Sequence, residues 1–121
     1  MNNITNNMEF VRMFEKFLAI YTGFKYAVCV DCCTNGILIS LELLNRLQKI
    51  NKDYVLNIPC RTYMSVPMTL KNNGWKISLI NKKWQGYYEI GNTNVFDAAT
   101  DFDNKMNLKY PFDSIVCVSF Q

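Results

Sequence analysis

Histidine is completely absent from this chain, and several kinds of catalytic site are excluded with it. The 121 residues contain no histidine, so neither a Ser-His-Asp nor a Cys-His arrangement can be built from them. Zinc sites normally take four ligands in two spaced pairs, and only Cys29, Cys32 and Cys33 of the five cysteines lie close together. We therefore interpret Cys29 and Cys117 as buried apolar residues on strands. A redox role for Cys32 or Cys33 at a helix start stays open as an alternative.

Long apolar runs and clustered charges are also missing. No run of about 18 apolar residues could span a membrane, and the first residues lack the basic and then apolar order of a signal peptide. The 13 basic and 10 acidic residues leave a net charge of +3, and Lys82-Lys83 is the single basic pair. This scatter favours a solvated surface over a nucleic-acid face. We expect a cytoplasmic protein that binds neither a membrane nor nucleic acid.

Apolar and aromatic residues, by contrast, are plentiful. Half of the chain is hydrophobic, with eight Phe, seven Tyr and two Trp, which is enough for a buried core. The sequence shows no internal repeat, no low-complexity run and no break in composition. We expect residues 1–121 to form a single domain or one part of a domain.

The spacing of the apolar residues predicts helices that alternate with short strands. The first predicted helix is capped by Asn6 or Asn7 and stops at Thr22-Gly23. Strands that alternate with helices of this length indicate a mostly parallel, doubly wound α/β sheet. The predicted helices cover residues 8–21, 37–47 and 65–73, the predicted strands cover residues 27–30, 54–58, 76–80, 94–96 and 114–118, and residues 82–91 form an aromatic-rich loop.

Two loops that follow strands carry candidate binding residues. Residues 33–36 form the turn at the start of a predicted helix, where free N–H groups and the helix dipole attract phosphate. The alternative is that Thr34 is an ordinary N-cap. Tyr63 follows the next strand and could lie flat against a planar ring, or simply pack half-buried. Arg61, beside it, could meet an anionic group or form a surface ion pair. In an open α/β sheet, both loops lie at the edge where ligands bind.

Asp97 is the most informative single residue. It closes a short apolar strand and is followed by Ala98 and Ala99, so a flat ligand would have room beside the carboxylate. A carboxylate that holds a pyridine nitrogen protonated turns that ring into an electron sink. The alternative is a turn cap after the strand. Ser119, after the last strand, could donate to a phosphate or only end the strand.

The order of these motifs resembles the DegT/DnrJ/StrS family of PLP-dependent sugar aminotransferases. The resemblance covers residues 9–121. Its motifs are F-E-x-x-x-A-x-Y-x-G at residues 14–23, C-T-N-G at residues 33–36, P-x-x-T-Y at residues 59–63, G-W-K at residues 74–76, D-A-A at residues 97–99 and S-F at residues 119–120.

The resemblance implies a set of roles around pyridoxal 5′-phosphate (PLP). Thr34, with Cys33 beside it, and Ser119 would hold the phosphate. Tyr63 would stack on the ring and Asp97 would pair with the pyridine nitrogen. The family usually has Gln or His, which reaches the phenolic oxygen of the ring, where this sequence has the shorter Thr100.

The resemblance also implies what lies outside these residues. The Schiff-base lysine is expected a few residues beyond Gln121, so residues 1–121 would be an incomplete large domain of a PLP fold-type I (aspartate aminotransferase-like) enzyme, inactive alone. We expect strand 27–30 to lack its neighbour, and a complementing polypeptide or a homodimer to complete the sheet. The implied substrates are an amino donor and a keto-sugar nucleotide. The alternative is a non-catalytic α/β module that binds phosphate or PLP, or serves interaction.

Overall fold

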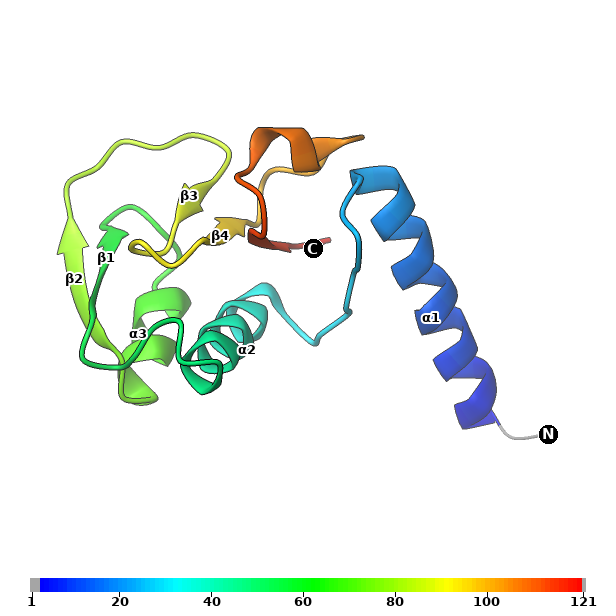
Figure 1. Cartoon of the computed structure of the whole chain (residues 1–121), viewed down its shortest axis with the longest axis horizontal. Helices are drawn as coiled ribbons and strands as arrows, with labels where there is room; N and C mark the ends of the chain where they lie inside the picture. Colours follow the sequence, from blue (N-terminus) through cyan, green and yellow to red (C-terminus); the bar gives the residue numbers. More distant parts are fainter. Residues whose placement is uncertain (1–2, 121) are drawn as a thin grey trace.

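The computed structural model describes residues 3–120, with side chains from residue 7 onward. The chain has a mixed α/β fold in which a long first helix stands apart from the rest (Figure 1). We call the rest, from α2 to β5, the α/β body. The elements are α1 (Asn3–Thr22), α2 (Cys33–Arg46), β1 (Val55–Pro59), α3 (Ser65–Asn72), β2 (Lys76–Ile80), β3 (Tyr88–Glu89), β4 (Val95–Ala98), the 3-10 helix η1 (Met106–Lys109) and β5 (Ile115–Val118).

The strands form two small sheets rather than one. β1 pairs in parallel with β2, and β4 pairs in parallel with β5, while β3 lies antiparallel to β4. The parallel pairs agree with the sequence prediction, whereas the antiparallel β3 lies in the segment predicted as a loop. Gly91 joins the sheets, because its N–H donates to the Asn57 carbonyl at 3.1 Å. A Cβ on Gly91 would lie 3.4 Å from Leu56 Cα, and its φ is +54°, so this close approach favours glycine.

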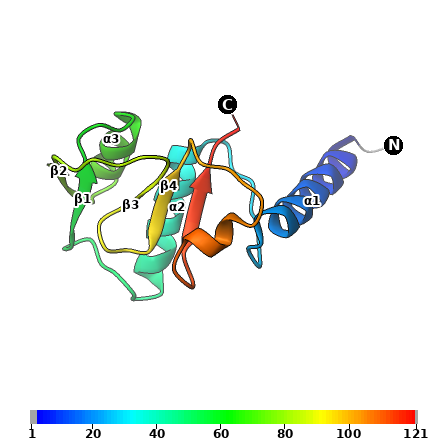
Figure 2. The same cartoon turned by 90° about the horizontal axis from the view of Figure 1, so that it is seen from above.

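The core of the α/β body lies between the helices and the sheets. Figure 2 shows α2 lying across one face of the paired strands β4 and β5. The apolar side of α2 is fully buried at Ile37 and Leu41, as the helical spacing predicts. Leu70 of α3 and Val95 of β4 are also fully buried in the same cluster. This packing fixes the ends of α2, β4 and β5 relative to one another.

Three predictions near the start of the chain are wrong. Residues 27–30 form no strand, because no described strand pairs with their backbone. The Cys29 N–H donates instead to Glu15 Oε2 at 2.8 Å. Cys29 is accordingly exposed, whereas Cys117 is buried on β5 as predicted. Since α1 begins at Asn3, Asn6 and Asn7 lie inside the helix rather than at its cap.

Helix α1 contacts the α/β body mainly through its C-terminal half. It ends at Thr22, with Gly23 at φ +83° as the predicted stop. The Lys105 N–H donates to the Tyr21 carbonyl at 2.8 Å, and the Tyr21 ring stacks on Phe102 with centroids 5.2 Å apart. Across residues 3–120, no helix combines the length and apolar character needed to cross a membrane.

Candidate functional site

The two parallel strands β4 and β5 end at the same edge of their sheet. Asp97 lies opposite Cys117 in the register, and Ala98 lies opposite Val118. Ser119 and the residues after Ala98 therefore leave the sheet together. Helix α2 begins at this edge, where Cys33 Sγ lies 3.5 Å from the Cys117 carbonyl oxygen. The topology thus brings a helix start and two strand ends to one place.

Asp97 is buried at this edge and accepts several hydrogen bonds. Its side chain is 5% exposed. Oδ2 accepts from the Tyr88 hydroxyl at 2.9 Å, and Oδ1 accepts from the Ala99 N–H at 3.1 Å. The Cys33 sulfur lies 3.9 Å from Oδ1 and 3.5 Å from the Cys117 carbonyl oxygen, and its single proton can be donated to only one of them. Because a carboxylate oxygen has two lone pairs, Oδ2 keeps one acceptor position that these contacts leave open.

The side-chain donors around Asp97 stay protonated at neutral pH. Burial raises the pKa of the Cys33 thiol to about 12, and the nearby Asp97 raises it further. Burial also raises the pKa of Tyr88 well above its ordinary value, and Asp97 adds to that rise, while the Thr62 hydrogen bond opposes it. Cys33 is thus a hydrogen-bond donor at this site and not a thiolate.

Asp97 lines a cavity of about 270 Å³, which is also lined by residues of the loop after β1. Three predicted site residues line it together: Tyr63 from that loop, and Asp97 and Thr100 from the end of β4. Tyr63 is 72% exposed, so its ring is free to meet a ligand in this cavity. The complete lining is Arg61, Thr62, Tyr63, Trp84, Asp97, Ala99 and Thr100.

The predicted phosphate residues are not brought together in this cavity. Thr34 is the second residue of α2, and its hydroxyl lies 3.0 Å from the hydroxyl of Ser65, the first residue of α3. The N-cap of α2 is Cys32, without a side-chain cap, so the alternative that Thr34 caps the helix is wrong. Ser119 is half-buried and follows β5. Neither Thr34 nor Ser119 lines the cavity.

The hydroxyl of Thr100 already has an acceptor. It donates to the Gly86 carbonyl at 3.1 Å. The oxygen can still accept a hydrogen bond, but the proton is engaged within the protein. Thr100 therefore does not offer, in this arrangement, the free donor that a Gln at this position would supply.

Four residues at this edge were missed by the sequence reasoning, namely Thr62, Ser65, Trp84 and Tyr88. Trp84 lines the cavity and donates from Nε1 to the Arg61 carbonyl at 2.8 Å. Tyr88 lies on a two-residue strand, which is too short to show a periodic pattern. The concentration of aromatic residues in 82–91 was the one available signal. Arg61 makes no ion pair with any residue the structure describes, so the predicted surface salt bridge is absent there.

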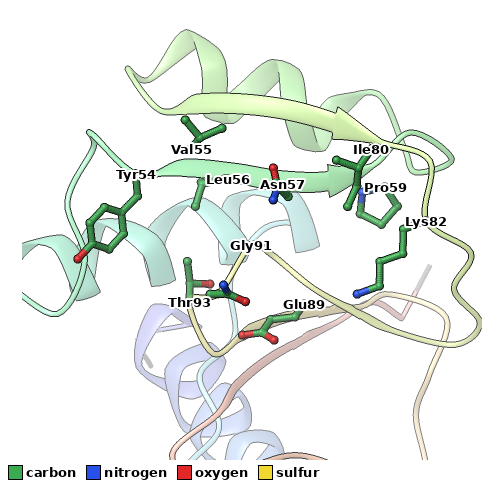
Figure 3. Close-up of a pocket in the computed structure, with 11 residues that line it drawn as sticks. Tyr54, Val55, Leu56, Asn57, Pro59, Ile80, Lys82, Glu89, Gly91 and Thr93 are labelled. Carbon is green, nitrogen blue, oxygen red and sulfur yellow. The ribbon is translucent and has the colours of Figure 1, made fainter.

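A larger cavity of about 450 Å³ lies away from this edge, along β1 (Figure 3). It is lined by residues of β1 and by the turn around Gly91, and the side chains of Lys82 and Glu89 extend toward it. None of the predicted site residues lines it. We therefore place the candidate site at Asp97 and not at the larger cavity, because Asp97 is a buried carboxylate that accepts hydrogen bonds from its neighbours.

The comparisons with known proteins bear on this site. The model of the DegT/DnrJ/EryC1/StrS aminotransferase family matches residues 1–88, which include Thr34 and Tyr63 and end before Asp97. A search of curated proteins gave no significant match, and a search of solved structures gave none either. Because the family model covers well over half of the sequence, the chain belongs to the DegT/DnrJ/EryC1/StrS aminotransferase family, whose enzymes depend on PLP.

Proposed function

We propose that this chain forms the N-terminal part of the large domain of a PLP-dependent aminotransferase. The observation that carries the proposal is that Asp97 and Tyr63, from two separate strand ends, line one cavity in a chain of this family. The complete domain would be a three-layer, mostly parallel sheet of PLP fold-type I. We take the substrates to be an amino donor and a keto-sugar nucleotide, on the basis of the family alone.

The residues at the cavity fit the ring of PLP, which, when bound, supplies a protonated pyridine that withdraws electrons from the reacting carbon. In this proposal the open acceptor position on Asp97 Oδ2 takes the ring N–H, and Tyr63 covers one face of the ring. The Ala99 N–H holds the other carboxylate oxygen. Burial of Asp97 makes its interaction with a ring N–H stronger than it would be in water.

The phosphate end requires a local rearrangement. Arg61 lines the cavity and supplies a positive charge for an anion. Thr34 and Ser119 stand near the start of α2, where the helix dipole favours a phosphate. Thr34 would have to exchange its contact with Ser65 for one with the phosphate. We propose that Thr100, in turn, contacts the phenolic oxygen only after its bond to Gly86 breaks.

We propose that the lysine for covalent attachment lies outside residues 1–121. No described lysine lines the cavity. We accordingly expect residues 1–121 to bind the cofactor without catalysing transamination. The chain itself would then contribute recognition of the ring and the phosphate.

The test is binding of pyridoxamine 5′-phosphate, which lacks an aldehyde and so forms no adventitious adducts with lysines. Asp97→Asn should weaken binding by about 10- to 100-fold, because one charge-assisted hydrogen bond is lost. Asp103→Asn makes the same chemical change on an exposed side chain outside the cavity and should bind like the wild type. Isothermal titration calorimetry measures both. Equal affinities for wild type and Asp97→Asn would leave only a phosphate-binding module, and no binding at all would end the proposal.

A further inference from the structure

We propose that Tyr88 is a positioning residue of this site, which fixes the direction of the Asp97 carboxylate toward the ring nitrogen, and that Thr62 orients the Tyr88 hydroxyl. The proposal rests on the proposed function, because it assigns a task to residues around the same carboxylate. Neither Tyr88 nor Thr62 is among the residues that the proposed function assigns to the ring or to the phosphate.

The register of the short strand β3 places Tyr88 beside Asp97. Tyr88 and Asp97 are direct partners in the antiparallel pairing of β3 with β4. Directly opposite residues of a ladder extend to the same face of the sheet. The neighbouring Tyr87 therefore extends to the opposite face, where it packs against Phe96 and Tyr110. A shift of one residue would place Tyr87 rather than Tyr88 opposite Asp97.

The hydrogen bonds among Thr62, Tyr88 and the Asp97 carboxylate can run in only one direction. The Tyr88 hydroxyl donates its single proton to Asp97 Oδ2 at 2.9 Å. Its contact with Thr62 Oγ1, at 2.6 Å, must then be one in which Thr62 donates to the tyrosine oxygen. The chain of donors runs from Thr62 to Tyr88 to Asp97. Each bond in such a chain strengthens the next, and all of them end on the carboxylate.

The tyrosine ring is itself held in place. Tyr88 is 3% exposed, and its ring lies against Trp84 with centroids 4.8 Å apart. Burial and the nearby Asp97 keep its pKa above the ordinary value, so the hydroxyl donates throughout the physiological range. Tyr88 is the described side chain that bonds to Oδ2, the oxygen with the open acceptor position. Without this hydroxyl, Oδ2 is free to turn away from the ring nitrogen.

The first experiment compares Tyr88→Phe with Tyr87→Phe in the full 121-residue chain. Both variants lose one hydroxyl and keep the ring, but the Tyr87 hydroxyl bonds to no residue that the structure describes. The probe is pyridoxamine 5′-phosphate labelled with ¹⁵N in the ring, whose nitrogen shift reports protonation as the pH is raised. Tyr88→Phe should lower the pH at which the bound ring loses its proton by about 0.5 to 1 unit. Tyr87→Phe should titrate like the wild type.

The possible outcomes separate this proposal from the proposed function. If the wild type binds no pyridoxamine 5′-phosphate, the proposed function fails and the role of Tyr88 fails with it. If Asp97→Asn loses ring protonation while Tyr88→Phe titrates like the wild type, the proposed function stands and this proposal alone is wrong. Thr62→Ser should keep the wild-type titration and Thr62→Val should move it toward that of Tyr88→Phe.

A second measurement needs neither ligand nor removal of the hydroxyl. Difluorotyrosine, a more acidic analogue, is introduced at position 88 and titrated by ¹⁹F NMR in the ligand-free chain. Replacing Asp97 by Asn should lower the titration midpoint of this analogue by about one pH unit, because the acceptor charge that disfavours the phenolate is gone. An unchanged midpoint would show that the two side chains do not interact, and the proposal would be overturned even if Tyr88→Phe fails to fold.

Discussion

Helices α1 and α2 are both apolar along one side, yet they have opposite environments. Ile37 and Leu41 of α2 are fully buried against the sheet of the α/β body. On α1, Phe10 is 69% exposed and Ile20 is 82% exposed. The same helical pattern is therefore accompanied by a fully buried side on α2, whereas on α1 the buried residues among the described side chains are Leu18 and Thr22, near its C-terminal end. Apolar periodicity states which side of a helix needs burial, and not what buries it.

The exposed side of α1 is large enough to matter for association. We define the α1 surface as Phe10, Met13, Phe17 and Ile20, which lie on one side of the helix and are each more than half exposed. Contiguous apolar surface of this kind is typical of interaction sites in soluble proteins. The exposed α1 surface favours a contact with a partner at this helix, whereas the partner predicted from the sequence is one that completes the sheet.

The largest effect should come from opening the core of the α/β body. Leu41→Ala should lower the free energy of unfolding by about 2–5 kcal/mol, because a fully buried side chain leaves a cavity behind. Leu43→Ala, on the same helix but 49% exposed, should cost much less. Urea unfolding followed by circular dichroism measures both. Equal losses would show that burial does not distinguish the two sides of α2.

Charge on the α1 surface tests the other half of the comparison. We expect the wild-type chain to self-associate, and Phe10→Lys or Ile20→Lys to weaken that association about tenfold or more, since one large apolar side chain contributes roughly 1.5–3 kcal/mol when buried. Leu108→Lys, on the α/β body and 79% exposed, is the matched control. Sedimentation velocity across a concentration series measures the dissociation constants. A wild type that stays monomeric at every concentration would contradict the prediction.

The last effect appears only at alkaline pH and concerns the buried thiols of the α/β body. Burial raises the pKa of Cys117 to about 11 and that of Cys33 to about 12. An unfolded thiol titrates near pH 8.5, so above that pH the unfolded chain releases protons that the folded chain keeps. Stability should therefore be unaffected below about pH 8.5 and should fall as the pH rises toward 11.

This pH dependence can be assigned by substitution. Cys117→Ala should flatten the loss of stability between pH 8.5 and pH 11, as measured by urea unfolding at each pH. Cys60→Ala, which replaces an exposed cysteine, should leave the slope unchanged. A slope that Cys117→Ala does not alter would assign the effect to other groups, such as the buried Tyr88.

The sequence predicted helices and strands well where the spacing of apolar residues within the element was enough to define them. The predicted strand at residues 76–80 is confirmed, and the predicted strand at 54–58 and helix at 65–73 are each within one residue of the observed bounds. The predicted strand at 27–30 is wrong because a strand needs a neighbour to receive its hydrogen bonds, and the family resemblance had already implied that this neighbour is missing from residues 1–121. The strand β3 was missed because two residues show no period.

The features of the candidate site also fall into those that the sequence predicted and those that it did not. The sequence by itself determined the family motifs, the buried Cys117, and the presence of Tyr63 and Asp97 after strands, because side-chain chemistry and strand ends can be read locally. Only the tertiary structure decided that Tyr63 and Asp97 line one cavity, that Thr34 faces Ser65, and that Tyr88 rather than Tyr87 donates to Asp97. Those facts depend on register and packing between distant segments, and a one-residue shift in β3 would reverse the last of them.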